Sequence, residues 1–237
     1  MFDEEFISNP LRDAVNTVET GKPSVKRTLG MEIFEHFSAN PKDGDIFNKA
    51  MEQLSQENMQ SIIDCYDFSC CNTIADLGGG YGNLLKGILA KYPEKKGVCF
   101  DFSHVIESLP EEMALQPNLR FEGGSLFDKV PENADTYILK HVIHGFNDEL
   151  CLQILRNCKK VMDHNSRLLI IDVIAEPNEK HSYTHFIDFI DFIMLMFTGG
   201  RERTKAQTAA LLEQVGLKIN DVFDSSKKDK IFEVVVI

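Results

Sequence analysis

The chain has 237 residues, which is enough for one α/β domain with a full core and a modest extension. Its 37 acidic residues outnumber the 25 basic ones and give a formal net charge of −12. This charge argues against nucleic-acid binding, because that function needs a basic surface. The amino terminus, MFDEEF, is acidic where a secretory leader would be basic, so we expect a cytoplasmic protein.

The longest apolar stretch, FIDFIDFIMLMF at 186–197, is too short to span a bilayer and contains Asp188 and Asp191. We interpret it as a buried amphipathic helix and expect no membrane contact. The six cysteines form no Cys-x-x-Cys pair and no cluster with histidine. We therefore expect reduced thiols, several of them buried, and no metal site.

Residues 1–70 are predicted to form a helical amino-terminal segment that precedes a separate domain at 71–237. Loops between short helices are predicted at Asn9-Pro10, 21–23 and 40–44, where proline, glycine and asparagine gather. Apolar residues then recur at helical spacing and form a stripe. The stripe consists of Phe47, Ala50, Met51, Leu54, Met59, Ile62 and Ile63.

Residues 74–85, IADLGGGYGNLL, are the most informative part of the chain. An apolar run is followed by glycines at 78, 79, 80 and 82, and the pattern then becomes helical. This order predicts a strand, a tight glycine turn and the start of a helix. Glycine lets the backbone approach a ligand closely, and the free N–H groups of a helix start attract an anion. A nucleotide-like cofactor with a carboxylate or phosphate fits such a turn.

The spacing of the motif distinguishes between cofactors. The dinucleotide fingerprint needs a glycine where this chain has Asn83, and the Gly-Lys-Ser/Thr end of a phosphate loop is absent. Asp101 ends the predicted second strand, where a carboxylate can accept both ribose hydroxyls. These features fit S-adenosylmethionine better than NAD. The alternative is a glycine-rich turn in an ordinary α/β domain.

Strands and helices alternate along the rest of the chain. Strands are predicted at 73–77, 97–101, 119–122, 135–140 and 167–174, and helices at 82–92, 103–109, 148–162, 184–197 and 205–215. The last two strands, Leu217–Asp224 and Lys230–Ile237, flank the polar turn SSKKD. The pattern predicts an α/β fold with a doubly wound, Rossmann-like sheet that is mostly parallel and closes with an antiparallel carboxy-terminal hairpin.

Four separated motifs occur in a fixed order: DLGGGYG (76–82), FDFSHVIE (100–107), FEGGSLFDKVPENADTYILKHVIHGFND (121–148) and GGRERT (199–204). From about Gly21 onward the chain resembles the class I S-adenosylmethionine-dependent methyltransferases. Among them it is similar to the small-molecule O-methyltransferases that include caffeate, acetylserotonin and anthracycline enzymes. The resemblance implies that 71–237 is a cofactor-binding catalytic domain.

The resemblance also implies which residues bind S-adenosylmethionine. Gly78 and Gly80 match positions under its methionyl part, with Asp76 organising the turn, and Asp101, followed by Phe102, matches the ribose acid. Three further matches follow along the chain. Ser125 and Leu126 occupy the place of the family's adenine-contacting Asp-Met pair, and Lys140 matches a lysine near the cofactor.

His144 matches the family's catalytic base, in a motif usually written His-Asp-Trp that reads His-Gly-Phe here. Such a base removes the proton of a hydroxyl as its oxygen attacks the methyl carbon, and imidazole titrates near the working pH. Asp172 and Glu202 match the two acids that orient the ring. The structural alternative is a histidine at a strand end, and His141 is a possible substitute base.

In the family a helical dimerisation domain usually precedes the catalytic domain, and most of it has no counterpart in this sequence. We therefore expect a monomer or a weak homodimer. The acceptor pocket is expected to be lined by phenylalanine and methionine from 186–197 and by the amino-terminal helices, which suggests an apolar, aromatic acceptor.

The sequence thus favours an S-adenosylmethionine-dependent O-methyltransferase that acts on a hydroxyl of a small aromatic or polyketide-like molecule. Two alternatives stay open. One is a family member that uses the cofactor without moving its methyl group, as in decarboxylation, hydroxylation or pericyclic reactions. The other is a non-catalytic, cofactor-binding regulatory protein. S-adenosylhomocysteine forms only if the methyl group moves, and the regulatory protein would show no turnover.

Overall fold

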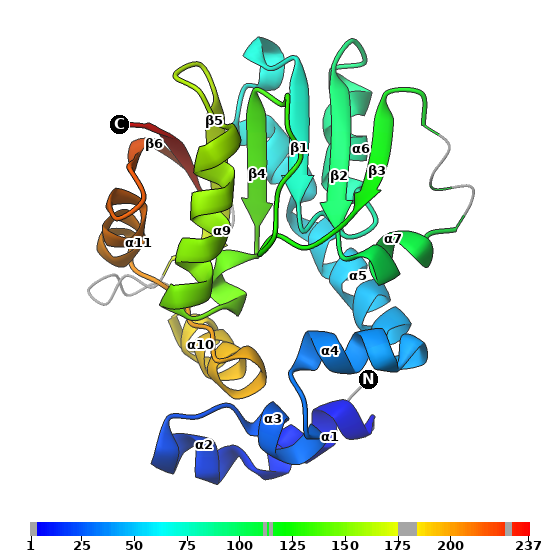
Figure 1. The fold of residues 1–237 in the computed structure, drawn as a ribbon, viewed down its shortest axis with the longest axis vertical. Coiled ribbons are helices and arrows are strands. Elements are labelled where there is room, and N and C mark those ends of the chain that lie inside the picture. The colour runs from blue at the N-terminus through cyan, green and yellow to red at the C-terminus, as the bar shows by residue number, and fades with distance from the viewer. Residues whose placement is uncertain (1–3, 111–112, 114–115, 175–183, 226–228) are drawn as a thin grey trace.

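The computed structural model describes residues 4–110, 113, 116–174, 184–225 and 229–237. The centre of the described part is a seven-stranded sheet with the strand order β3-β2-β1-β4-β5-β7-β6 (Figure 1). The strands are β1 Thr73–Leu77, β2 Lys96–Asp101, β3 Leu119–Gly123, β4 Thr136–Lys140, β5 Arg167–Val173, β6 Leu217–Asp224 and β7 Asp229–Val236. Strands β1 to β5 are parallel, and β6 and β7 pair as an antiparallel hairpin whose β7 joins β5. The predicted fold class is confirmed.

Helices cover both faces of this sheet (Figure 1). On one face lie α5 (Pro41–Cys65) and α6 (Asn83–Lys91), whose apolar side chains share a core with β1, β4, β5 and β7. On the other face lie α9 (Asp148–Val161) and α11 (Lys205–Glu213), over a second core. The short helix α7 (Ser103–Glu107) follows β2. The predicted helices at 82–92, 103–109, 148–162 and 205–215 therefore all exist, with ends within a few residues of the prediction.

Local capping fixes where α9 and α11 begin. The side chain of Asn147 accepts a hydrogen bond from the N–H of Leu150 at 3.0 Å, and this bond starts α9. Thr204 and Gln207 exchange hydrogen bonds in a capping box that starts α11. The residues just before these two helix starts are therefore held in fixed positions.

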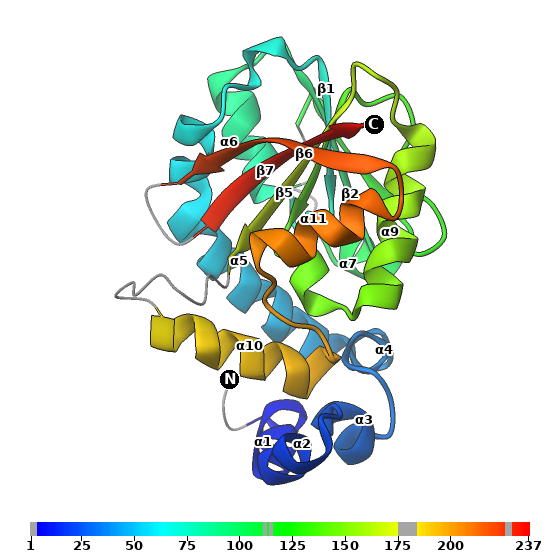
Figure 2. The same ribbon diagram turned by 90° about the vertical axis from the view of Figure 1, so that its left-hand side faces the viewer.

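The described residues before β1 are mostly helical. They form α1 (Glu5–Arg12), α2 (Ala14–Thr20), α3 (Ser24–Leu29), α4 (Ile33–Ala39) and α5, followed by the short 3-10 helix Phe68–Cys70. Figure 2 shows α1, α2 and α3 beyond α10 (Thr184–Thr198), which lies between them and the sheet. A small core of Phe6, Val25, Ile33 and Phe37 joins α1, α3 and α4. The division of the chain at residue 70 stays a prediction.

Of the three predicted loops, 21–23 is confirmed, 40–44 is right only at Asn40, which separates α4 from α5, and Asn9-Pro10 is wrong. Gly21 ends α2 in the left-handed conformation, with φ of 65°. Pro10 lies inside α1, and its ring is buried. The apolar contacts of the ring offset the loss of the backbone hydrogen bond that proline cannot donate. Pro41 occupies the first turn of α5, where the missing N–H has no helical partner to lose, so 41–44 are helical.

The prediction of a buried helix at 186–197 is right about the helix and wrong about its burial. In α10 Met196 is fully buried, whereas Phe186 and Phe189 are 41% and 55% exposed. The exposed residues lie in the first turns of α10, and the later residues are half-buried or buried where α10 packs between α1–α3 and the sheet (Figure 2). Met51 and Leu54 of the predicted stripe on α5 are exposed as well. No described helix combines the length and the apolar character needed to cross a bilayer.

All six cysteines are free thiols, and four of them are buried, in agreement with the prediction. The buried ones are Cys71, Cys99, Cys151 and Cys158. Burial raises the pKa of the Cys158 thiol to about 12, so this thiol stays protonated and packs as an apolar group.

Candidate active site

The glycine turn lies at the carboxyl end of β1. Gly78, Gly80 and Gly82 have φ of 78°, 56° and 75°, a region that side chains rarely occupy. A Cβ on Gly78 would lie 2.8 Å from Val142 Cγ2, so glycine is required there for packing as well. A Cβ on Gly80 would meet no atom within 4 Å. The backbone at Gly80 therefore borders open space that a ligand can fill.

Asp101, at the end of β2, is joined directly to this turn. Its Oδ2 accepts a hydrogen bond from the N–H of Gly80 at 2.8 Å, and its Oδ1 accepts one from the N–H of Phe102 at 2.7 Å. Burial raises the pKa of Asp101, while these two hydrogen bonds oppose the rise. A carboxylate has lone pairs for about four hydrogen bonds, so Asp101 can still accept ribose hydroxyls.

Asp76 supports the turn from below. Its carboxylate is buried, and its Oδ2 is 2.9 Å from the place a Cβ on Gly79 would take. Burial raises the pKa of Asp76 to about 7, the charge of Lys140 opposes this, and Asp101 adds to it. Asp76 and Lys140 are thus close enough for their charges to interact, and the organising role of Asp76 stays a prediction.

Ser125 and Leu126 form the loop after β3. The Ser125 hydroxyl accepts a hydrogen bond from the N–H of Phe127 at 3.2 Å, so it stabilises its own loop. The half-buried Leu126 packs against the core under α9. Phe102 stacks on His104, with 5.6 Å between the ring centroids. Phe102 contacts the predicted ribose acid through its backbone N–H, while its ring packs on His104.

His144 lies in a short 3-10 helix, Ile143–Gly145, that follows β4. Its Nδ1 is 2.8 Å from Glu202 Oε1 and 3.8 Å from Asp172 Oδ1. The side chain of His144 is 15% exposed, and both acids are buried. The structure thus brings together the three residues that the sequence predicted as a catalytic set, although they are far apart in the chain.

The ring of His144 is the positively charged member of this set at neutral pH. Burial lowers the pKa of His144, but the charge of Asp172, the hydrogen bond to Glu202 and the charge of Glu202 outweigh burial and raise it to about 9. Burial raises the pKa of Asp172 to about 7, against the effect of His144. In the form described, Nδ1 of His144 is therefore a donor to Glu202.

Arg203 fixes the loop that carries His144, a role that sequence reasoning missed. Its guanidinium is 3% exposed and donates to the carbonyl oxygens of Ile143 at 2.7 Å and Phe146 at 2.8 Å. It also pairs with Asp148 at 2.8 Å. The motif GGRERT was noted in the sequence, but nothing in it indicates that Arg203 clamps carbonyl groups on both sides of His144.

Gly200 and Asp191 were missed too. A Cβ on Gly200 would overlap the carbonyl oxygen of His144, so only glycine fits there. The N–H of Glu202 donates to Asp191 Oδ1 at 2.7 Å, which places Glu202 through a residue of α10. The acidic break in the apolar stretch at 186–197 was the available signal for Asp191.

His141 lies next to His144 but has a partner of its own. Its Nε2 is 3.0 Å from Asp229 Oδ1, and the ring centroids of the two histidines are 5.5 Å apart. Burial lowers the pKa of His141 by more than the hydrogen bond to Asp229 raises it. This second pair of histidine and carboxylate was not predicted.

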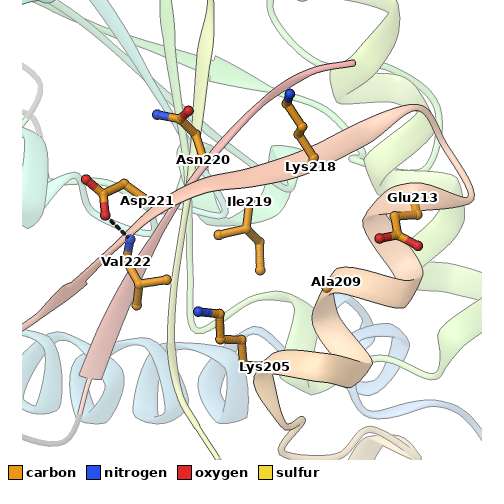
Figure 3. Close-up of a pocket in the computed structure, with 8 residues that line it drawn as sticks. All are labelled: Lys205, Ala209, Glu213, Lys218, Ile219, Asn220, Asp221 and Val222. Atoms are coloured by element: carbon orange, nitrogen blue, oxygen red, sulfur yellow. Dashed lines mark hydrogen bonds between the residues drawn. The ribbon is translucent and has the colours of Figure 1, made fainter.

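The described cavities differ in their relation to these residues. A small cavity of about 10 Å³ lies beside His144, Asp172 and Glu202. A larger groove of about 340 Å³ lies between α11 and β6, bordered by Lys205, Glu213 and residues 218–222 (Figure 3). No predicted site residue lines this groove. The predicted site residues lie instead at the carboxyl ends of the parallel strands, where open α/β sheets bind their ligands.

The fold and the site define a protein with the class I methyltransferase fold. The solved structure of LaPhzM matches with a TM-score of 0.94 at 29% identity, covering 100% of this chain and 71% of LaPhzM. The mitomycin 7-O-methyltransferase MmcR matches with a TM-score of 0.93 at 28% identity, covering 100% and 70%. Residues 9–218 match the O-methyltransferase domain family, and the chain belongs to this family.

Curated relatives come from bacteria and plants. Phenazine O-methyltransferase PhzM of Lysobacter antibioticus is 30% identical over 224 residues, which cover 93% of this chain and 65% of that protein. Caffeic acid 3-O-methyltransferase of Clarkia breweri is 35% identical over 211 residues, covering 88% and 55%. The chain thus spans less than two thirds of the length of these relatives.

Proposed function

We propose that this chain is an S-adenosylmethionine-dependent O-methyltransferase that acts on a hydroxyl of a small aromatic or polyketide-like acceptor. One observation carries the proposal: the glycine turn with Asp101 and the His144 set lie at the same edge of one sheet, on the neighbouring strands β1, β2, β4 and β5. Membership of the O-methyltransferase domain family supports it. So do relatives named for phenazine and caffeic acid, both of which are aromatic.

The cofactor-binding role falls to the glycine turn and the residues around it. Gly80 borders open space for the methionyl part, Gly78 keeps the turn close to Val142, and Asp101 accepts hydrogen bonds from the ribose. A related solved structure, the methyltransferase CalO1 of calicheamicin biosynthesis, is 26% identical and is a form with bound S-adenosylhomocysteine. When bound, S-adenosylmethionine supplies an electrophilic methyl group on a sulfonium.

The proton-removing role falls to His144. Its Nε2 accepts the proton of the acceptor hydroxyl, while Nδ1 stays bonded to Glu202 and close to Asp172. The pKa of about 9 means that His144 must first lose its own proton. A cation next to the ring, such as a sulfonium, lowers this pKa by like-charge repulsion and favours the basic form. Holding the hydroxyl oxygen in line with the methyl group supplies the rest of the rate.

The test is to incubate the chain with S-adenosylmethionine and a panel of phenols, naphthols and hydroxyphenazines, and to measure S-adenosylhomocysteine together with the methylated product. The proposal expects both products in equal amounts with at least one acceptor. Tight cofactor binding without S-adenosylhomocysteine from any acceptor would contradict it and favour a non-methylating family member.

A further inference from the structure

The second pair, His141 and Asp229, has a fixed geometry of its own. His141 is the first residue after β4 and has φ of 53°, a left-handed conformation that is uncommon for residues other than glycine. Its N–H donates to the carbonyl oxygen of Ile171 at 2.9 Å, which extends the pairing of β4 with β5. Such strain persists only where the surroundings hold it, and it is frequent at ligand sites. The backbone of His141 is therefore held in place at the end of β4.

Asp229 holds the ring from the other side. It is the first residue of β7, pairs in register with Val173 and is 1% exposed. Its Oδ1 is 3.0 Å from Nε2 of His141. Since the carboxylate accepts the proton on Nε2, the tautomer of a neutral His141 is fixed and Nδ1 carries a lone pair.

The two histidines differ in their exposure and in their charge. The His141 side chain is 29% exposed and that of His144 is 15% exposed. The groups that act on His141 are Asp229, Lys140 and His144, and with burial their net effect lowers its pKa. At neutral pH His141 is therefore a hydrogen-bond acceptor at Nδ1, next to a cationic His144.

We propose that His141, oriented by Asp229, is a specificity-determining residue of the acceptor site and accepts a hydrogen bond from a second hydroxyl next to the reacting one. This inference rests on the proposed function. The ligand class is an arene with hydroxyls on adjacent carbon atoms. A hydrogen bond spans about 2.8 Å, so two rings with centroids 5.5 Å apart can each reach one oxygen of such a pair.

The test compares catechol with phenol, which differ only in the second hydroxyl, by calorimetric titration into the chain saturated with S-adenosylhomocysteine. One additional hydrogen bond predicts that catechol binds about threefold to tenfold more tightly. His141→Phe should remove this difference. His141→Asn should keep part of it, because asparagine tolerates a positive φ and has an accepting oxygen. His164→Asn, in an exposed turn, is the matched control and should change nothing.

Equal affinity for the two probes in the wild-type chain, or no binding of either, contradicts the inference. So does a catechol preference that survives in His141→Phe. Circular dichroism shows whether that variant is folded, and if it is not, His141→Gln replaces it. Methyl transfer to phenol and catechol is measured separately. Methylation of both with equal KM, unchanged in the variants, would leave the proposed function standing and remove the role of His141.

Discussion

The two halves of the carboxyl edge are built by different means. At β1 and β2 the site is made of backbone: three glycines with positive φ and one carboxylate that accepts two backbone N–H groups. At β4 and β5 it is made of side chains, an imidazole between two buried acids, on a loop that Arg203 clamps. The geometry of the first half depends on backbone conformation, and the second half depends on the interaction of buried charged side chains.

Because of this difference, the two halves should respond differently to substitution. A backbone site loses affinity stepwise when one hydrogen-bonding group is removed. A buried charge set fails as a unit, because the removal of one member leaves the others uncompensated. Substitutions in the two halves should therefore have separable effects on cofactor affinity and on reaction rate.

The largest expected effect is on the rate of methyl transfer. General-base catalysis contributes about 10²–10⁴-fold, so His144→Ala should lower kcat by about that factor. Steady-state production of S-adenosylhomocysteine with a confirmed acceptor measures it. Full turnover in this variant would mean that proton removal takes place elsewhere, with His141 or water as the next candidates.

The clamp on the His144 loop gives the next effect. Arg203→Met leaves the carbonyl groups of Ile143 and Phe146 without their donor, which should cost about 2–4 kcal/mol in the free energy of unfolding. Arg201→Met is the matched control, because Arg201 also pairs with Asp148 but is largely exposed and should cost less than about 1 kcal/mol. Urea denaturation compares the two. If the two variants lose the same free energy of unfolding, the hydrogen bonds from Arg203 to the carbonyl groups do not stabilise the loop.

A smaller effect is expected in the backbone half. Asp101→Ala removes hydrogen bonds from the ribose to a charged acceptor, which should cost about 1.5–3 kcal/mol, or about tenfold or more in affinity for S-adenosylmethionine. Asp128→Ala, on an exposed loop nearby, should leave the affinity unchanged. Calorimetric titration with S-adenosylmethionine measures both affinities. Preferential binding of NAD by the wild type would contradict the cofactor assignment.

The smallest effect is a displacement of the pH profile. The wild-type kcat/KM should rise with pH toward the His144 pKa of about 9, because only the deprotonated ring accepts a proton. Glu202→Gln removes a negative charge that favours the imidazolium, so the acid limb should move to lower pH by about one pH unit or more. Asp172→Asn should move it in the same direction, because the charge of Asp172 also raises the pKa of His144. If the acid limb of the profile stays at the same pH in both variants, the group that titrates there is not His144.

Much of the backbone half could be predicted from the sequence, because glycine and strand-end acids have strong local preferences. Gly80 and Asp101 are only 21 residues apart in the chain. Gly80 follows a strand, and Asp101 ends one, that the apolar pattern of the sequence predicts. Pro10 and the exposed start of α10 differ from the prediction, because tertiary packing decides whether a proline is tolerated and which turns of a helix are covered.

In the side-chain half, only the residues that match motifs of the O-methyltransferase family could be predicted. His144 and Glu202 are separated by 58 residues, and no local pattern indicates their contact. The clamp by Arg203 and the pair of His141 with Asp229 depend on where β5, β7 and the 199–204 motif lie in space. A monomer or weak homodimer is still a prediction.

The most direct test of the division between the two halves is calorimetric titration of S-adenosylmethionine into His144→Ala and Asp101→Ala beside the wild type. We predict wild-type affinity for His144→Ala and about tenfold or more weaker binding for Asp101→Ala. If His144→Ala loses affinity as Asp101→Ala does, or if Asp101→Ala binds like the wild type, the two halves are not separate and the account is contradicted.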